Sequence, residues 1–428
     1  MRHVLLTAAA AATLATGAPG AMAQEVTLGR FFGACENAGT DTTTSVGEPC
    51  IIQSIINAAD AEIDGVSINT LPTDWGNYYD QIKAAFAGGT PPDVFVMHRH
   101  RIPEFAGIGA LSELSGDLEA AWIDPSDWSE NALEAVSYEG GIYGVPMDFH
   151  ANLWHVNMGL MEAAGLVDDT GAPILPSSPE ELLEHARMVE EATGQDYLAA
   201  DFAQFPIGVR LVLALMWQQD ANIFTEDGTA TINTEEAANA VTAITQLFDA
   251  GYANPQLNYA DSQQAFLNGE AAVLVNGTWV VDFYDAQAAD PEVALSNYYA
   301  ADFPTLFDTG ATWADSHMWA IPSTLEGAER DAALRVLAFI NDHNIDWART
   351  GHMAVRSSVV ESEAYTNLPH RDEYAGTAAI ARDTPPSERY GAIQDVLNRE
   401  LQAIWLTGKP VEDALADAEL EVQDQLDR

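Results

Sequence analysis

The chain has very few basic residues for its length. Its 428 residues include 17 Lys plus Arg against 65 Asp plus Glu, which gives a formal net charge of −48. Nucleic acids and anionic membrane surfaces are therefore excluded as partners, because both are bound by basic surfaces. The acidic residues are spread along the chain rather than gathered in one tail, which is typical of a surface adapted to salt, where charges are screened within about 10 Å.

Long hydrophobic runs are also absent. The apolar stretch inside Met1–Ala23 is shorter than the roughly 20 residues that a membrane span needs. It follows a basic start and ends in Ala21-Met22-Ala23, the small-x-small pattern of a cleaved secretory signal. We therefore expect a mature chain that begins at Gln24 and is soluble in the periplasm. The residue directly after the cleavage site is Gln24 and not a cysteine, so no lipid anchor is expected.

Cysteine is limited to Cys35 and Cys50. Export to an oxidising compartment predicts a disulfide bond between them. The bond would close a polar loop and remove unfolded-chain entropy worth about 3 kcal/mol. One interpretation is that the disulfide bond only stabilises a surface loop. The other is that the disulfide bond holds Glu36 or Asn37 at the mouth of a ligand cleft.

Motifs of catalysis are missing from the sequence. There is no H-E-x-x-H, G-x-S-x-G or P-loop pattern, and the histidines lack zinc-ligand spacing. Carboxylate pairs are not diagnostic, because 65 acidic residues guarantee chance pairs. The sequence therefore predicts a protein that is not an enzyme and holds no cofactor and no metal. A secreted glycoside hydrolase is kept as a remote alternative.

The chain does contain enough apolar residues, 47%, to build sizeable cores. Its first part alternates strand and helix patterns, which predicts a parallel sheet with helices on its faces. In such sheets ligands lie beyond the carboxyl ends of the strands, so the loops after Phe31 and Met97 are expected to face a cleft. The predicted strands are 25–33, 66–70 and 92–97, and the predicted helices are 50–63 and 74–87, with Asp74 as a cap.

Five loose motifs occur in a fixed order over nearly the whole mature chain. They are W-x-x-Y with a later Gly-Gly and PDV (75–94), G-x-IYGVP with its following strand (140–157), AFLNGEAAVLVNGTW (265–279), GATWADSHMWAIP (310–322) and the closing helix (406–426). Together they resemble extracellular solute-binding protein family 1, the maltose-binding-protein-like carbohydrate receptors of ABC importers.

The resemblance implies an α/β fold of two lobes, the type II-like periplasmic binding protein fold. Each lobe would hold a mixed, mainly parallel sheet flanked by helices, and several chain crossings would form the hinge. Residues 24–147 plus about 304–350 would build lobe 1, and about 148–303 plus 351–428 would build lobe 2. We expect a monomer.

The function implied is capture of a mono- to oligosaccharide by hinge closure, followed by delivery to the membrane subunits of an ABC importer. A different solute would share all these motifs and change only the residues in the cleft. An anionic sugar, a polyol and a glycosylated osmolyte therefore remain as alternatives.

Sugar binding needs aromatic faces for the rings and polar side chains for the hydroxyls. At the aromatic positions we expect Trp279, at a strand-to-helix turn, to contact ligand. In that turn Gly277 would permit the tight bend and Thr278 would cap the next helix. Trp313 and Trp217 are weaker candidates.

The polar candidates lie at the two predicted crossings and after the third strand. Asp148 and His150 follow Pro146 at the first crossing, and Asp315 and His317 lie in the return segment. Residues 98–101, HRHR, form a cluster of basic residues that includes Arg99 and His100. These side chains would either neutralise neighbouring acidic residues or bind an acidic sugar. In the segment GHMAVRSS the resemblance adds Arg356, although Ala354 stands where the family has proline.

Overall fold

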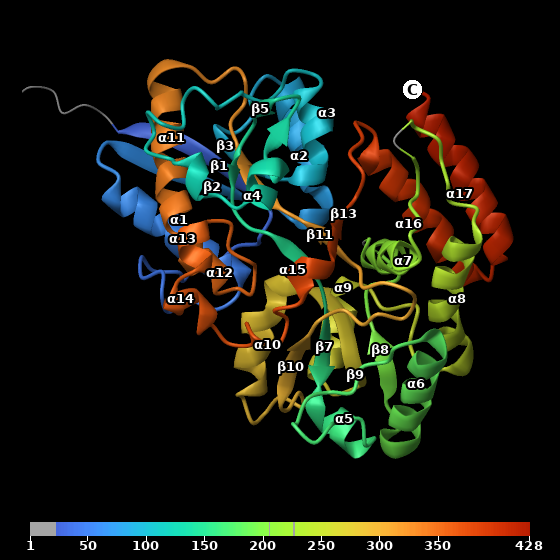
Figure 1. The fold of residues 1–428 in the computed structure, drawn as a ribbon. Coiled ribbons are helices and arrows are strands. Elements are labelled where there is room, and N and C mark those ends of the chain that lie inside the picture. Colours follow the sequence, from blue (N-terminus) through green and yellow to red (C-terminus); the bar gives the residue numbers. More distant parts are fainter. Residues whose placement is uncertain (1–22, 205, 226) are drawn as a thin grey trace, which may run out of the picture.

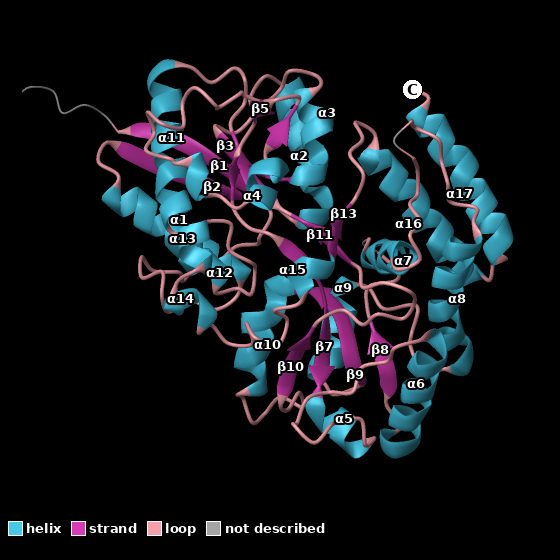
Figure 2. Cartoon of the chain, in the orientation of Figure 1, coloured by secondary structure: helices cyan, strands magenta, loops and turns pink. Residues whose placement is uncertain are grey.

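The computed structural model describes residues 23–204, 206–225 and 227–428. These residues form two lobes, each a sheet with helices packed on its faces (Figures 1 and 2). The predicted signal segment lies outside the described residues, apart from Ala23 at its end. Within the described ranges, no helix combines the length and hydrophobicity needed to cross a membrane.

The first lobe is built on a five-stranded sheet in the order β2-β1-β3-β12-β6. The predicted strand–helix alternation is confirmed, with β1 paired in parallel to both β2 and β3. The carboxylate of Asp74 accepts a hydrogen bond from the backbone N–H of Gly76, so the predicted cap of α2 is also confirmed. The elements are β1 (Gln24–Arg30), α1 (Glu48–Glu62), β2 (Val66–Pro72), α2 (Trp75–Ala87), β3 (Val94–His98), β6 (Val145–Pro146) and β12 (His317–Ala320).

The second lobe holds a sheet in the order β13-β11-β7-β9-β8, with β10 paired to β7. The central strand β7 is buried along its whole length, because helices cover both faces of the sheet. Its elements are β7 (His150–Asn157), α6 (Pro179–Thr193), β8 (Asp196–Ala199), α7 (Ile207–Trp217), α8 (Glu235–Ala250), α9 (Tyr259–Leu267), β9 (Ala271–Gly277), β10 (Tyr298–Ala301), β11 (Thr312–Asp315) and β13 (Ala381–Asp383).

Shorter elements and the remaining helices complete the two lobes. In the first lobe these are η1 (Arg99–Arg101), α3 (Ile102–Ala106), η2 (Pro125–Asp127), α4 (Glu130–Ala135), β4 (Ser137–Tyr138), β5 (Gly141–Ile142), α11 (Gly327–Asp342), α12 (Asn344–Ala348), α13 (Ser357–Val360) and α14 (Glu363–Thr366). In the second they are α5 (Met158–Ala163), η3 (Thr278–Val280), α10 (Val281–Ala288), α15 (Thr377–Ile380), α16 (Tyr390–Thr407) and α17 (Val411–Leu426).

The chain crosses between the lobes where β6 leads to β7 and where β11 leads to β12. Both sheets are mixed, as predicted, and their antiparallel pairs involve these crossing strands, which run back against their neighbours. The boundaries depart from the predicted ones. Thr312–Asp315 pairs with β7 and β13 in the second sheet, so the return crossing lies at 315–317 rather than near 304. Residues 351–366 stay with the first lobe, because Tyr365 of α14 packs with Ala348 of α12.

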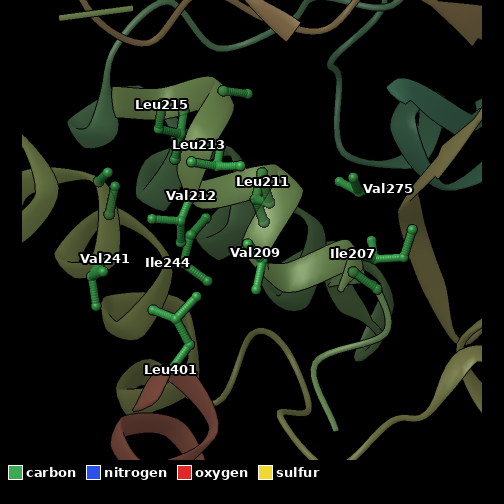
Figure 3. Close-up of a cluster of buried hydrophobic side chains, with 14 of the residues drawn as sticks. Ile207, Val209, Leu211, Val212, Leu213, Leu215, Val241, Ile244, Val275 and Leu401 are labelled. Carbon is green, nitrogen blue, oxygen red and sulfur yellow. The ribbon is translucent and has the colours of Figure 1, made fainter. Parts of the chain in front are cut away.

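Helix α7 lies at the centre of the second lobe's core. Figure 3 shows its Ile207, Val209, Leu211, Val212, Leu213 and Leu215 among Val241 and Ile244 of α8 and Leu401 of α16. At the end of α7, Trp217 is 1% exposed and its indole N–H donates to Asn222. The structure thus places Trp217 in the core and not at a ligand site, because the apolar face of α7 on which it lies is turned inward.

Candidate functional site

A cavity of about 530 Å³ lies between the lobes. Its volume is within the range of small-molecule sites, about 300–1,000 Å³. The loop after β1 contributes to its wall, as the sequence predicts, whereas from the predicted loop after Met97 the lining includes only His98, the last residue of β3. The lining residues come from both lobes and from the crossing strands: Phe31, Phe32, Gly33, Ala34, Glu48, Pro72, Thr73, Asp74, Trp75, His98, His150, Ile207, Arg210, Tyr259, Trp279 and His317.

Aromatic side chains from both lobes face this cavity. Trp75 comes from α2 of the first lobe, and Tyr259 and Trp279 come from the second. The indole N–H of Trp279 donates to the hydroxyl of Tyr259 at 2.8 Å, which fixes the orientation of the ring. Two aromatic surfaces on opposite lobes can hold a ring between them.

In the turn before Trp279, Gly277 and Thr278 do not have the roles that the sequence predicted. Gly277 has φ −113°, which any residue adopts, but a Cβ there would lie 1.8 Å from the ring of Trp279. The glycine is therefore needed for close approach of the indole and not for the bend. Thr278 does not cap the following helix, since its hydroxyl is buried without a hydrogen-bond partner among the described residues.

Asp148 lies behind the cavity wall, fully buried. Its carboxylate accepts hydrogen bonds from Nδ1 of His150 and Nδ1 of His317, both at 2.8 Å, from the backbone N–H of His317 at 3.1 Å, and from the indole of Trp347 at 2.7 Å. Burial opposes its ionisation, but His317, His352 and these hydrogen bonds outweigh burial and hold the pKa of Asp148 well below its usual range. Asp148 is therefore an ionised support for the histidines.

His150 and His98 in the wall are neutral hydrogen-bonding groups. Burial and the neighbouring His317 lower the pKa of His150 to about 4, and burial with His317 lowers the pKa of His98 far below its ordinary value. An ionised carboxylate only accepts, so His150 donates to Asp148 through Nδ1 and keeps Nε2 as an acceptor. His150 can therefore accept a hydrogen bond from a ligand hydroxyl.

The structure separates the other sequence candidates into two groups. Trp313, Asp315 and His100 are buried just behind the cavity wall, with His100 bonded to the carboxylate of Asp315 and the Trp313 ring 5.7 Å from that of His150. The side chains of Arg99 and Arg356 lie away from the cavity, because each is held in ion pairs. Arg99 contacts Glu134 and Asp383, and Arg356 contacts Asp127 and Asp342.

Several cavity residues were not named as ligand candidates from the sequence, among them Trp75, Tyr259, Arg210 and Glu48. Trp75 was recognised only as part of a motif. For Arg210 a signal existed, since it is the one charged residue in the apolar helix IGVRLVLALMW. Nothing in the sequence points to Glu48, whose pKa burial raises well above the usual value, with Asp148 and Asp282 adding to the effect.

The predicted disulfide between Cys35 and Cys50 is present and borders the cavity. Ala34 and Glu48, close to the two cysteines in sequence, line the wall, whereas Glu36 and Asn37 do not. The disulfide bond thus fixes the loop after β1 beside the site. The residues that this loop contributes to the cavity wall differ from the two that the sequence suggested.

Asp282 of α10 links the lobes by accepting a hydrogen bond from the backbone N–H of Gly47 at 2.6 Å. Burial raises its pKa to about 7. Between pH 4 and 7 the folded state then binds more protons than the unfolded state, so stability falls as pH rises. Replacing Asp282 by Asn keeps the acceptor and removes this cost. We expect D282N to gain about 2 kcal/mol in free energy of unfolding relative to wild type on going from pH 5 to pH 8.

Denaturant unfolding of both proteins at pH 5, 6, 7 and 8 measures this difference. Asp331→Asn is the control, because Asp331 is exposed on α11 and has no ion pair among the described residues, so its effect should not change with pH in the same way. A constant difference between D282N and wild type across this range would contradict the elevated pKa.

A family model for bacterial extracellular solute-binding proteins matches residues 51–341. That span is more than half of the chain, and the chain belongs to this family. Among known proteins it is 23% identical over 367 residues to a lactose-binding protein of Rhizobium radiobacter, covering 81% of this chain and 82% of the relative. It is 25% identical over 275 residues to the maltodextrin-binding protein MdxE of Bacillus subtilis, covering 60% of each.

Solved structures confirm the predicted two-lobe fold. The GacH receptor of Streptomyces glaucescens matches with a TM-score of 0.80 at 20% identity, over 95% of this chain and 99% of that one. Maltose-bound MalE3 of T. maritima also gives 0.80 at 20% identity, over 94% and 99%.

Proposed function

We propose that this protein captures a carbohydrate between its two lobes and delivers it to an ABC importer. The observation that carries the proposal is the inter-lobe cavity, with aromatic faces on both lobes and imidazoles between them. The relatives named as lactose- and maltodextrin-binding proteins and the maltose-bound neighbour support a sugar as ligand.

Capture would follow from hinge closure. A ligand favours the closed form only by contacts that exist in that form, so residues of both lobes must touch it. Trp75 from the first lobe and Trp279 from the second meet this requirement, and His150 and His317 on the crossing strands would bind hydroxyls at the hinge itself. The closed form would be the one recognised by the importer's membrane subunits.

We infer that the mature chain begins at Gln24, is released into the periplasm by its signal segment, and acts as a monomer. We also infer that the protein binds without converting its ligand. Family membership supports a binding role, and sugar recovered unchanged after long incubation would test it.

A thermal-shift titration of residues 24–428 with neutral sugars, polyols and uronates tests the function. Ligand that binds only the folded state stabilises it by RT ln(1 + [L]/Kd), about 4 kcal/mol at a thousandfold excess over Kd. We expect a shift at micromolar concentration of at least one sugar. Trimethylamine N-oxide at high concentration is the control, because such osmolytes stabilise folded proteins without a site. No saturable shift with any sugar would contradict the proposal.

A further inference from the structure

Arg210 places a buried positive charge in the wall of the cavity. It lies on α7, where every other residue is apolar, and only 4% of it is exposed. Figure 3 shows the apolar side chains of α7 on either side of this position, Val209 and Leu211, facing apolar groups of the core. Keeping a guanidinium in such surroundings is costly unless it is paired and hydrogen-bonded.

Within the described residues, the side chain of Arg210 makes no hydrogen bond and has no carboxylate at ion-pair distance. Its Nε is buried without a partner. The guanidinium instead lies over the ring of Trp313 at 3.7 Å, with the rings of Trp279 and Trp75 at 5.7 and 5.8 Å. Arg210 lines the cavity and its terminal N–H groups have no partner among the described residues, so they are free to donate to a ligand oxyanion.

The other buried arginines of the described chain donate several hydrogen bonds to the protein, although Nε of Arg371 is also buried without a partner. Arg30 donates to Thr70, Gln53 and the carbonyl of Gly33, and Arg371 donates to the carbonyls of Ala348, Gly351 and His352. None of these three buried arginines has a carboxylate partner among the described residues, and Arg210 is the one whose guanidinium also makes no hydrogen bond there.

The acids around the cavity are engaged elsewhere. Asp315 is bonded to His100, and Asp201 accepts from the backbone N–H groups of Ala203 and Gln204. Glu48 faces the cavity with its pKa raised by burial, and Asp74 is exposed and caps α2. The cavity therefore holds a guanidinium that no carboxylate of the described residues contacts at ion-pair distance.

We propose that the ligand of this cavity is an acidic sugar whose oxyanion pairs with Arg210 while its ring lies between Trp75 and Trp279. This inference rests on the proposed carbohydrate function and narrows it to one substrate class. A carboxylate on a uronate and a phosphate on a sugar ester share the required chemistry, and a planar carboxylate matches the two parallel N–H bonds of a guanidinium.

The test compares each acidic sugar with its neutral parent. Dissociation constants are measured by calorimetry for glucose, glucuronate and glucose 6-phosphate, and for galactose and galacturonate, with wild type, R210Q and R210K. Wild type should bind an acidic member about 10 to 100 times more tightly than its parent, the contribution of a charge-assisted pair. R210Q should lose that preference, and R210K should keep part of it.

Arg187→Gln is the matched control, because Arg187 is an exposed arginine on α6 paired with Glu184 and Glu191, and its loss should leave the preference intact. Preference for a uronate or for a phosphate identifies the oxyanion. A neutral parent that binds wild type at least as tightly as its acid would overturn this inference and leave the carbohydrate function standing. Absence of binding to all five sugars would count against both. The wild-type comparison holds even where R210Q fails to fold.

Discussion

Replacement of Asp148 by alanine is expected to lower the free energy of unfolding by about 3–5 kcal/mol at pH 7. The substitution removes a buried carboxylate that accepts from the imidazoles of His150 and His317, a backbone N–H and the indole of Trp347. Each of these donors would remain buried without its partner, and an unsatisfied buried donor costs about 1–3 kcal/mol. Chemical denaturation of the ligand-free protein measures the loss.

The pH dependence separates this role from a general packing defect. Because the pKa of Asp148 lies well below the unfolded value, its stabilising contribution is present above about pH 4 and is lost as the pH falls through the folded pKa. The penalty in D148A should thus be constant from pH 8 to pH 5. Asp424→Ala is the control, since its ion pair with Arg428 is exposed and worth at most about 1 kcal/mol. A loss in D148A no larger than that of the control would contradict the support role.

Replacement of Trp279 by alanine is expected to weaken sugar binding by about 30- to 1,000-fold, equivalent to about 2–4 kcal/mol. The indole supplies the second lobe's aromatic face, and Gly277 and Tyr259 hold it in place. Calorimetric titration with the sugar identified in the screen measures the change. Phenylalanine at this position keeps a face for the ring and should recover part of the affinity.

Trp122 provides the control for Trp279. It is 84% exposed on the first lobe and does not line the cavity, so W122A should bind sugar like the wild type. The melting temperature of ligand-free W279A must also be measured, because Trp279 packs against the second lobe's core. Unchanged affinity in a folded W279A would show that the ligand does not use this face.

Local signals in the sequence predicted the first lobe well. The cap at Asp74 and the alternation of apolar strands and amphipathic helices lie within short segments, so propensity and periodicity identify them. Long-range pairing was harder to predict. Thr312–Asp315 has the composition of a strand in either lobe, and only its pairing with β7 and β13 assigns it to the second.

Some residues of the site were also predictable from local sequence, and others were not. Trp279, His150 and His317 were predicted from their positions at a turn and at crossings, and the structure brings all three to one cavity, although no ligand contact has been tested. Asp148 was predicted beside them as a sugar-binding group, but it lies behind the wall, because its carboxylate is held by hydrogen bonds from His150 and His317. Arg210 was missed, because a helix of buried apolar residues gives no indication of which face meets a cavity.

The sequence by itself determined the family resemblance, the acidic surface, the pairing of the two cysteines and the type of most elements in the first lobe. These depend on composition and on residues near one another in the chain. Only the tertiary structure decided which side chains surround the cavity, which carboxylate supports the histidines, and that Arg210 lacks a partner. Those outcomes depend on contacts between β3, β7, α7 and β12, segments far apart in sequence whose relative positions are fixed by packing of two cores against a shared hinge.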